Sequence, residues 1–543
     1  MARITAATPR GIGAHLIDID VALDDHLALP QIHVTGLLDC EARECALRVQ
    51  SALRSSGFEL PQRGVTVRLE PETFPMEPDH LDFPIAIALL SAVGVLSDTA
   101  CEGRCFYGEL ALDGTLHPVR GSLAIAEAAS SHGFSEILAP ASCAAEAASL
   151  GAVKVIPVRS LKEAMGHLSG RAPRPACPPV VTPNPTGGQS LPDLSEIRGQ
   201  QAAKRALEVA AAGGHHMLLI GSPGSGKTAL ARRLPGLLPP MSREESLEAT
   251  KIQSLVAESP LTHLATQRPF RSPHPAISRV GMTGGGVPTR PGEASLAHAG
   301  VLFLDDLPDC HLDSVLDLGQ PLREGRTTVL NVPSHIVFPA RFTLVAAMSP
   351  CPCGHFDDPG NVCRCSPTLI ERHRSRIPGL FLNTIDLFIS MAPIAPRDLP
   401  ARFSEASAEV AARVLEARRV QQNRFPGADS EIALNAAMKK EDIRRHCRPH
   451  DDARRLHDTL RADLRLGERA VARIIKVART LADLDRKRFD QEPTSLRGDH
   501  SRPGLGDLVK LTLFACRSRW PRDDARGYRD REAPKSFLTG GFS

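Results

Sequence analysis

The chain has 543 residues, of which 42% are hydrophobic and 23% charged, and this composition is typical of a globular protein with about three domains of roughly 100 to 200 residues each. Its net charge of +3, from 65 basic and 62 acidic residues, is too small to identify a binding partner. No run approaches the roughly 18 to 20 apolar residues of a membrane helix, and the first residues lack the apolar segment of a secretion signal, so we expect a cytoplasmic protein without membrane contact.

Residues 1–170 predict an α/β domain. Strand-like runs, GVTVRLE and KVIPV, alternate with the apolar helical stretches DFPIAIALLSAVGVL and SLAIAEAASSHGF. Residues 171–194 are dense in proline and glycine and predict an exposed linker.

Residues 195–395 predict a nucleotide-binding core built on a parallel sheet. The helix IRGQQAAKRALEVAAAGG precedes the strand HHMLLIG, a glycine-rich loop leads into a second helix, and the strands GVLFLDD and FTLVAAM follow. Residues 396–490 have helical periodicity and predict a separate helical domain. Its many arginines fit either a phosphate-contacting face or solvated helix faces. Residues 491–543, rich in arginine, aspartate and glycine, predict a disordered tail.

The stretch GSPGSGKT matches the phosphate-binding loop at every fixed position and lies between a predicted strand and helix. Glycines allow backbone amides to turn toward phosphate oxygens, the lysine neutralises the β and γ phosphates, and the threonine ligates Mg²⁺. We therefore expect ATP and Mg²⁺ at this loop, which consists of Gly221, Ser222, Pro223, Gly224, Ser225, Gly226, Lys227 and Thr228.

The apolar run VLFLDD predicts a buried strand that ends in two carboxylates. Asp305 is placed to reach the Mg²⁺ ion, usually through water. Asp306 follows at the position of a base that must lie within about 3 Å of the attacking water. Aspartate is one methylene shorter than glutamate, and the alternative is that Asp306 is a solvated strand-end residue.

Thirteen cysteines in a chain without a secretion signal indicate reduced thiols or metal ligands. Two C-x-C pairs in CPCGHFDDPGNVCRC suit a tetrahedral Zn²⁺ ion, with inert thiols or a redox pair as alternatives. The predicted zinc ligands, called the cysteine cluster below, are Cys351, Cys353, Cys363 and Cys365.

These motifs carry a family resemblance. The stretches RGQQAAKRALEVAAAGGHHMLLIGSPGSGKTALARRL, RPFRSPHPAISRVGMTGGGVPTRPGEASLAHAGVLFLDDLPD and FPARFTLVAAMSPCPCGHF resemble the magnesium-chelatase-like AAA+ ATPases of the YifB/ComM type over roughly residues 10–490. The resemblance implies a helical lid and a ring, expected to be a hexamer, with ATP between subunits. For the ComM branch it implies a DNA helicase that drives branch migration during natural transformation, with single-stranded or branched DNA as partner.

The N-terminal block resembles the family domain that is akin to the proteolytic domain of Lon. A serine-lysine dyad is not supported, because PDHLDFPIAIALL holds no serine and PVRGSLAIAEAA no lysine. The glycine-rich stretch GMTGGGVPTRPG is a candidate pore loop or a flexible surface turn.

The chain departs from the family at three positions that serve hydrolysis. Asp306, Ser349 and Thr384 stand where the family usually has glutamate, asparagine and arginine. Loss of an arginine finger costs on the order of 10³ to 10⁵ in rate in other systems. Arg374 and Arg376 lie just upstream and are alternative arginines for a subunit boundary, whereas Arg473 matches the second sensor arginine of the family.

The sequence leaves three functional hypotheses open. The first is a slow DNA-directed ATPase, and the second is a nucleotide-binding ring scaffold with weak or no hydrolysis. The third is a chelatase-type motor acting on a protein partner, because a fold alone does not choose between these functions.

Overall fold

The computed structural model describes residues 2–24, 32–59, 63–71, 78–179, 191–331, 334–356, 358, 360–392, 405–425, 433–447 and 468–485. The predicted tail and the centre of the predicted linker, residues 180–190, lie outside these ranges. Within them, no helix is both long and apolar enough to cross a membrane. The chain forms two compact units. Unit 1 comprises Met1–Leu191, Leu238–Phe303 and Asp313–Thr343, and unit 2 comprises Pro192–Leu237, Leu304–Leu312 and Leu344–Ser543.

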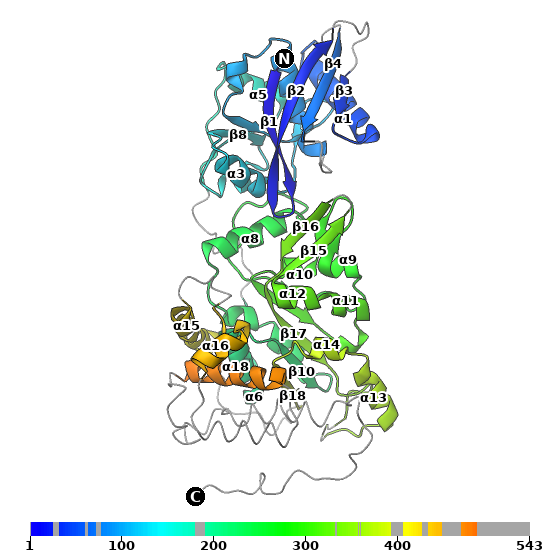
Figure 1. The fold of residues 1–543 in the computed structure, drawn as a ribbon, viewed down its shortest axis with the longest axis vertical. Helices are drawn as coiled ribbons and strands as arrows, with labels where there is room; N and C mark the ends of the chain where they lie inside the picture. Colours follow the sequence, from blue (N-terminus) through cyan, green and yellow to red (C-terminus); the bar gives the residue numbers. More distant parts are fainter. Residues whose placement is uncertain are drawn as a thin grey trace, which may run out of the picture. The chain divides into compact units, whose positions relative to one another are not determined.

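Unit 1 contains a seven-stranded sheet of order β3-β4-β2-β1-β5-β8-β9 (Figure 1). The pairs β1–β2 and β2–β4 are antiparallel, and the remaining neighbours run parallel. The strands are β1 (Ala2–Arg10), β2 (Gly13–Asp24), β3 (Ile32–Thr35), β4 (Gly64–Glu70), β5 (Arg104–Phe106), β8 (Glu136–Pro140) and β9 (Lys154–Val158).

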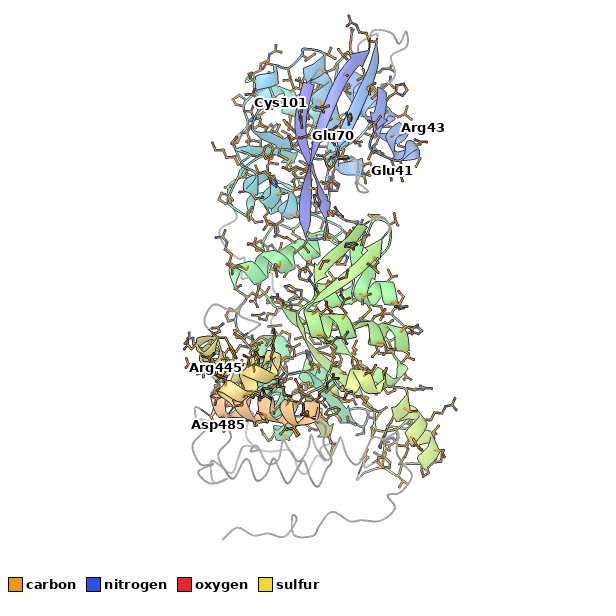
Figure 2. The ribbon with its side chains drawn as sticks, in the orientation of Figure 1. Glu41, Arg43, Glu70, Cys101, Arg445 and Asp485 are labelled. Carbon is orange, nitrogen blue, oxygen red and sulfur yellow. The ribbon has the colours of Figure 1, made fainter. Side chains whose placement is uncertain are left out.

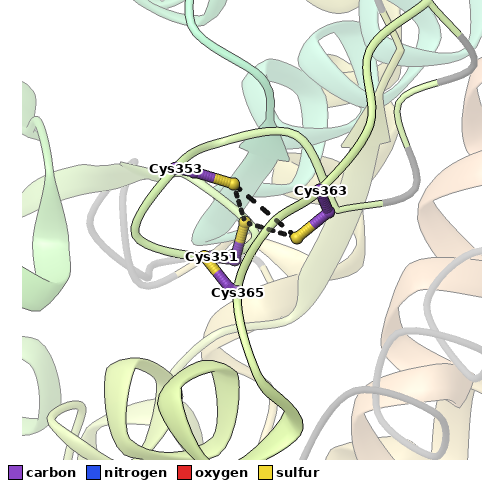
Figure 3. Close-up of side chains that lie close together, drawn as sticks. All are labelled: Cys351, Cys353, Cys363 and Cys365. Atoms are coloured by element: carbon purple, nitrogen blue, oxygen red, sulfur yellow. Dashed lines mark hydrogen bonds between the residues drawn. The ribbon is translucent and has the colours of Figure 1, made fainter.

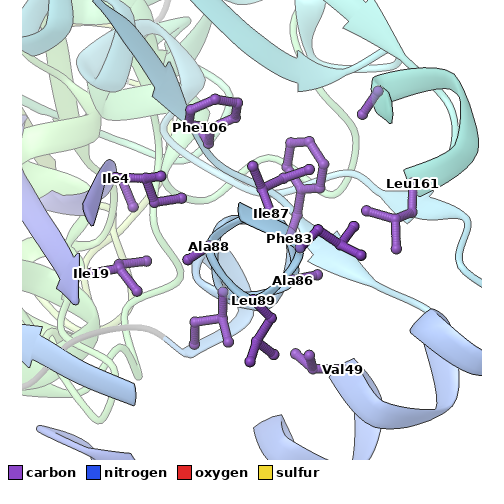
Figure 4. Packing of buried hydrophobic residues seen from close by; sticks show 14 of the residues in the cluster. Ile4, Ile19, Val49, Phe83, Ala86, Ile87, Ala88, Leu89, Phe106 and Leu161 are labelled. Carbon is purple, nitrogen blue, oxygen red and sulfur yellow. The ribbon is translucent and has the colours of Figure 1, made fainter. Parts of the chain in front are cut away.

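Helices cover both faces of this sheet. Successive side chains of a strand point to opposite faces, and apolar side chains are buried on both. Phe106 and Leu138 lie in one apolar cluster, whereas Cys105 and Ile137 lie in the other. Figure 4 shows the first cluster around one apolar helix, α2. The helices of the first face are α1 (Asp39–Ser55), α2 (Asp82–Ala92) and α5 (Leu161–Leu168), and those of the second are α3 (Ser122–Ser131) and α4 (Ala144–Ala148).

The later segments of unit 1, Leu238–Phe303 and Asp313–Thr343, consist mainly of short helices and hairpins. The strands β15 and β16 form an antiparallel hairpin, as do the two-residue strands β12 and β13. These elements are α8 (Arg243–Ser254), β11 (Phe270–Arg271), α9 (Arg279–Thr283), β12 (Gly284–Gly285), β13 (Arg290–Pro291), α10 (Glu293–Leu296), α12 (Gly319–Glu324), β15 (Arg326–Asn331) and β16 (Ser334–Pro339). Two further elements, β14 (Gly300–Leu304) and α11 (Leu312–Asp317), cross into unit 2 by one residue.

The central strand of unit 2 is β10 (Met217–Gly221), whose five residues are all buried. It pairs in parallel with β17 (Phe342–Met348) on one side and β18 (Leu387–Met391) on the other. The helix α6 (Gln201–Gly213) precedes β10, and its C-cap is Gly214, whose φ of 72° is in the left-handed region. The short helix α7 (Lys227–Ala231) follows. The predicted parallel-sheet core is thus confirmed.

The C-terminal region of unit 2 is helical wherever the structure describes it. Its elements are α15 (Ser407–Arg424), the 3₁₀ turn η7 (Asn435–Ala437), α16 (Lys440–His446) and α18 (Glu468–Leu484). Gln421 on α15 donates from Nε2 to the carbonyl of Ala212, which lies in the last turn of α6. His215 connects the same region to α18, because its Nε2 lies 2.8 Å from Oγ1 of Thr480. These side chains satisfy polar groups where the C-terminal helices meet the end of α6.

Many arginines of this helical region form internal contacts. Arg424 and Arg479 both bind the buried carboxylate of Asp483 at 2.7 Å. Arg413 bonds to Glu208 at 2.6 Å, and Asp485, labelled in Figure 2, pairs with Arg205. Arg413, Arg424 and Arg479 match neither sequence-based alternative, a phosphate-contacting face or a solvated face. Arg419, Arg444 and Arg445 are exposed, as residues of solvated helix faces would be. The pairs Arg413–Glu208 and Arg205–Asp485 connect the C-terminal helices to α6, whereas Arg424 joins α15 to α18 and Arg479 pairs within α18.

Candidate nucleotide-binding site

The predicted phosphate loop connects β10 to α7 in unit 2. Lys227 is only 9% exposed, and its Nζ donates to the carbonyl oxygens of Gly221 at 2.8 Å and Ser222 at 3.0 Å. Burial lowers the pKa of Lys227, whereas the carboxylates of Asp305 and Asp306 act in the opposite direction. The ammonium group therefore lies inside the loop with two carboxylates nearby.

The loop fits a group rich in anionic oxygens. Gly224 and Gly226 have φ values of 78° and 90°, in the left-handed region that glycine adopts most easily. The hydroxyls of Ser222 and Ser225 are buried and have no hydrogen-bond partner within the part of the chain that the structure describes. A buried hydroxyl without a partner is unfavourable, and a phosphate oxygen would supply the missing bond. The residues present thus suit the phosphates of a nucleotide.

Thr228 and Asp305 lie together as the sequence predicts. Oγ1 of Thr228 donates to Oδ2 of Asp305 at 2.8 Å, although the two residues are 77 positions apart. Asp305 follows directly after β14 and is half-buried. A threonine hydroxyl and an aspartate carboxylate are the protein groups that hold Mg²⁺ in phosphate-loop enzymes.

Asp306 is exposed and has left-handed backbone angles, with φ 46° and ψ 53°. Aspartate tolerates this region better than most residues. Its amide donates to Oδ1 of Asp305 at 3.1 Å. Although Asp306 is exposed, partial desolvation of its carboxylate and the negative charges of Asp305 and Asp309 raise its pKa, whereas Lys227 and His373 lower it. A raised pKa suits a group that accepts a proton from water.

Ser349 follows the last residue of β17 and lies beside a histidine that sequence reasoning missed. Oγ of Ser349 lies 3.5 Å from Nε2 of His373, and the carbonyl oxygen of Ser349 lies 3.2 Å from the same nitrogen. His373 is 7% exposed on α13 (Pro367–Ser375), and burial lowers its pKa. No motif marks His373, because it meets Ser349 across 24 residues of sequence.

The two upstream arginines occupy different environments. Arg374 is 8% exposed, donates from Nε to the carbonyl of Pro350, and lies 5.0 Å above the ring of Phe356. Arg376 is exposed and pairs with Asp309 at 2.9 Å. The expectation that both could reach across a subunit boundary is therefore wrong for Arg374, because its guanidinium packs inside its own chain.

Thr384 and Arg473 meet the same stretch of backbone. Oγ1 of Thr384 donates to the carbonyl of Phe381 in α14 (Gly379–Leu382) at 2.6 Å. Nη1 of Arg473, on α18, donates to the carbonyl of Ile385 at 2.7 Å and lies 3.3 Å from those of Leu382 and Asn383. The hydrogen bonds of Arg473 thus run to backbone around Thr384 and not to the phosphate loop.

The cysteine cluster is assembled in three dimensions, as Figure 3 shows. One ligand atom from each of the four residues lies within 4.8 Å of the others. The sulfur atoms lie 3.4 Å apart in Cys351 and Cys353, 3.7 Å apart in Cys351 and Cys363, and 3.6 Å apart in Cys353 and Cys363. Hydrogen bonds from the backbone near His355 and Arg364 lower the pKa of Cys353 to about 6.

Comparison with known proteins gives one consistent family. Models described as magnesium chelatase, subunit ChlI, match residues 193–399 and 20–143, and a model of the C-terminal part of that subunit matches residues 404–493. The protein YifB of Salmonella typhimurium is 39% identical over 481 residues, which cover 88% of this chain and 92% of the relative. The competence protein ComM of Haemophilus influenzae is 38% identical over 490 residues, 89% of this chain and 94% of the relative.

Proposed function

Because the chain belongs to the magnesium-chelatase-like AAA+ ATPase family of the YifB/ComM type, we propose that it binds Mg-ATP at residues 221–228 and hydrolyses it slowly as a ring-forming motor on DNA. The observation that carries this proposal is the hydrogen bond of 2.8 Å between Thr228 and Asp305. It brings the two expected Mg²⁺ ligands together beside the buried ammonium of Lys227.

In this proposal the residues have separate roles. Lys227 neutralises phosphate oxygens, and Thr228 with Asp305 holds Mg²⁺, which supplies charge neutralisation on the phosphates. Asp306 orients and deprotonates the attacking water, and Ser349 donates a hydrogen bond from the end of β17. Arg473 stands at the family position of a second sensor, and it would have to leave its bonds with the backbone around Thr384 to reach a nucleotide.

DNA is proposed as a partner because of the similarity to a named relative. The relative from Haemophilus influenzae is named a competence protein, and competence concerns the uptake of DNA. We extend this role to the present chain as a proposal, together with a hexameric ring and a cytoplasmic location. The chelatase-type motor acting on a protein partner is the rival. Salt-sensitive DNA binding would argue against that rival, because phosphate contacts impose a steep salt dependence.

A second candidate function is a nucleotide-binding ring subunit without useful hydrolysis. A specific observation favours it: Thr384, at the position of the family arginine, uses its hydroxyl within its own segment. A threonine supplies no positive charge to a transferring phosphate. The exposed Arg376 could supply this charge in its place only by leaving Asp309.

Nucleotide binding is tested by titrating the full chain with a fluorescent ATP analogue in the presence of Mg²⁺. We expect Lys227→Ala to weaken binding at least about tenfold, because charge-assisted bonds to phosphate are lost. The matched control is Lys162→Ala, since Lys162 is exposed on α5 in unit 1. Equal affinities of the wild type and Lys227→Ala would refute the assignment of the loop.

A further inference from the structure

The cysteine cluster has the dimensions of a single-ion site. A tetrahedral zinc ion with Zn–S bonds of about 2.3 Å places its four sulfurs roughly 3.8 Å apart. The sulfur separations of 3.4 to 3.7 Å among Cys351, Cys353 and Cys363 are close to this value. They are far longer than a disulfide bond of about 2.05 Å, and all four cysteines are free thiols.

The cluster also joins two elements of the nucleotide site. Ser349 directly follows the end of β17, and Cys351 lies two residues further along the chain. Cys365 directly precedes Ser366, whose side chain caps the N-terminus of α13, the helix that carries His373. A metal held by both cysteine pairs would therefore fix the position of Ser349 relative to His373.

A third contact connects the cluster to the phosphate loop. Gly354 lies between the two cysteine pairs, is buried, and has a φ of 81°. A Cβ atom at this position would lie 2.4 Å from Cδ of Pro223, which is a member of the phosphate loop. The loop that closes the cluster thus packs directly on the loop proposed to bind phosphate.

We infer that the cysteine cluster binds one Zn²⁺ ion, and that this zinc centre holds the phosphate loop and Ser349 in the arrangement that binds nucleotide. The second half of the inference rests on the proposed nucleotide binding, whereas the first half does not. Zinc has no redox chemistry, and four thiolates occupy all of its tetrahedral coordination positions. The proposed centre is therefore structural and does not touch the reacting atoms.

The first test measures metal content and nucleotide affinity on the same purified full-length protein. We expect about one zinc per chain in the wild type, little or none in the double variant Cys363→Ser, Cys365→Ser, and an affinity for the fluorescent ATP analogue at least about tenfold lower in that variant. The control Cys40→Ser, exposed on α1, keeps both properties.

The outcomes separate the two halves. A wild type that holds no metal, or holds iron instead, overturns the zinc assignment. A double variant that lacks zinc but binds the analogue within about twofold of the wild type overturns the coupling. A wild type that binds zinc but no nucleotide refutes the proposed function together with the coupling, and leaves the zinc assignment standing.

A second pair of variants tests the contact with Pro223 while all four thiols remain. Gly354→Ala places a methyl group against Pro223, so we expect zinc to stay bound and nucleotide affinity to fall several-fold. Gly360→Ala lies in the same loop, has no positive φ, and would meet Oδ1 of Asp358 at an ordinary 3.5 Å, so it serves as the control. Equal nucleotide affinities of the two variants, with zinc present in both, would contradict the coupling.

Discussion

Asp306 is the residue that we propose as the base for the attacking water, and neighbouring charges affect its pKa. Partial desolvation and the carboxylates of Asp305 and Asp309 raise the pKa of Asp306, so it ionises at a higher pH than an ordinary aspartate. A base must be deprotonated to act, and ATP turnover should therefore fall as the pH drops through this raised pKa.

Removing one charge next to Asp306 should shift the acidic limb of the pH profile of ATP turnover. In Asp309→Asn a repelling carboxylate is lost, and Arg376 is left without the carboxylate to which it bonds at 2.9 Å. The loss of the Asp309 charge favours the ionised form of Asp306, so the acidic limb of the pH profile of kcat should shift to lower pH. The exposed Asp113, in unit 1, gives the control Asp113→Asn. An acidic limb that stays in place would exclude Asp306 as the titrating base.

Some residues of the candidate site can be predicted from local sequence patterns, and others cannot. The phosphate loop is eight contiguous residues, and Asp305 ends an apolar strand, so both are visible as local patterns. His373 and the contact between Gly354 and Pro223 depend on how distant segments fold together, and no local pattern marks them. The burial of Arg374 is of the same kind, because it depends on the ring of Phe356.

At the scale of elements, one buried ion pair connects α1 to α2 in unit 1. Asp82 begins α2, is fully buried, and accepts from Arg48 on α1 at 2.6 and 3.2 Å. Burial raises the pKa of Asp82 to about 6, against the opposing effect of Arg48. The carboxylate of Asp82 thus connects two helices of the apolar core.

Removal of this carboxylate should loosen both helices. We expect Asp82→Ala to lower the free energy of local opening of α1 and α2 by about 3 kcal/mol, because a partly buried arginine loses its partner. Asp79→Ala should cost less than about 1 kcal/mol, since that carboxylate is exposed and lies 3.7 Å from Arg48. Hydrogen exchange of the amides in both helices measures the difference. Similar exchange in the two variants would show that the buried pair is not what connects the helices.

The regular elements follow closely from sequence periodicity. The runs GVTVRLE, KVIPV and FTLVAAM are β4, β9 and β17 residue for residue, because each is a run of mainly apolar or β-branched residues with clear ends. The helical stretch predicted from DFPIAIALLSAVGVL ends earlier, at Ala92. The arginines of the lid were less predictable, because a charged residue on a helix forms an internal pair only when a distant carboxylate such as Asp483 meets it.

At the scale of the whole molecule, the sequence-based domain boundaries remain proposals. They assign residues 195–395 to one core, whereas the compact units place Leu238–Phe303 and Asp313–Thr343 with the N-terminal residues. The phosphate loop, Asp305, Asp306, Ser349 and the cysteine cluster all belong to unit 2. Every residue proposed for nucleotide binding and hydrolysis within one chain is therefore held by a single compact unit.

The central claim is that this unit turns over ATP despite Asp306, Ser349 and Thr384. The most direct test is steady-state ATP hydrolysis by the full chain, with and without branched or single-stranded DNA, beside Lys227→Ala and the triple variant Asp306→Glu, Ser349→Asn, Thr384→Arg. We predict slow turnover that DNA stimulates and Lys227→Ala abolishes. The triple variant should be faster, since an arginine finger alone contributes on the order of 10³ or more in other nucleotide hydrolases. Wild-type hydrolysis no higher than that of Lys227→Ala, with or without DNA, would contradict the claim. If the triple variant then gained activity, the chain would be a ring subunit that binds ATP without hydrolysing it.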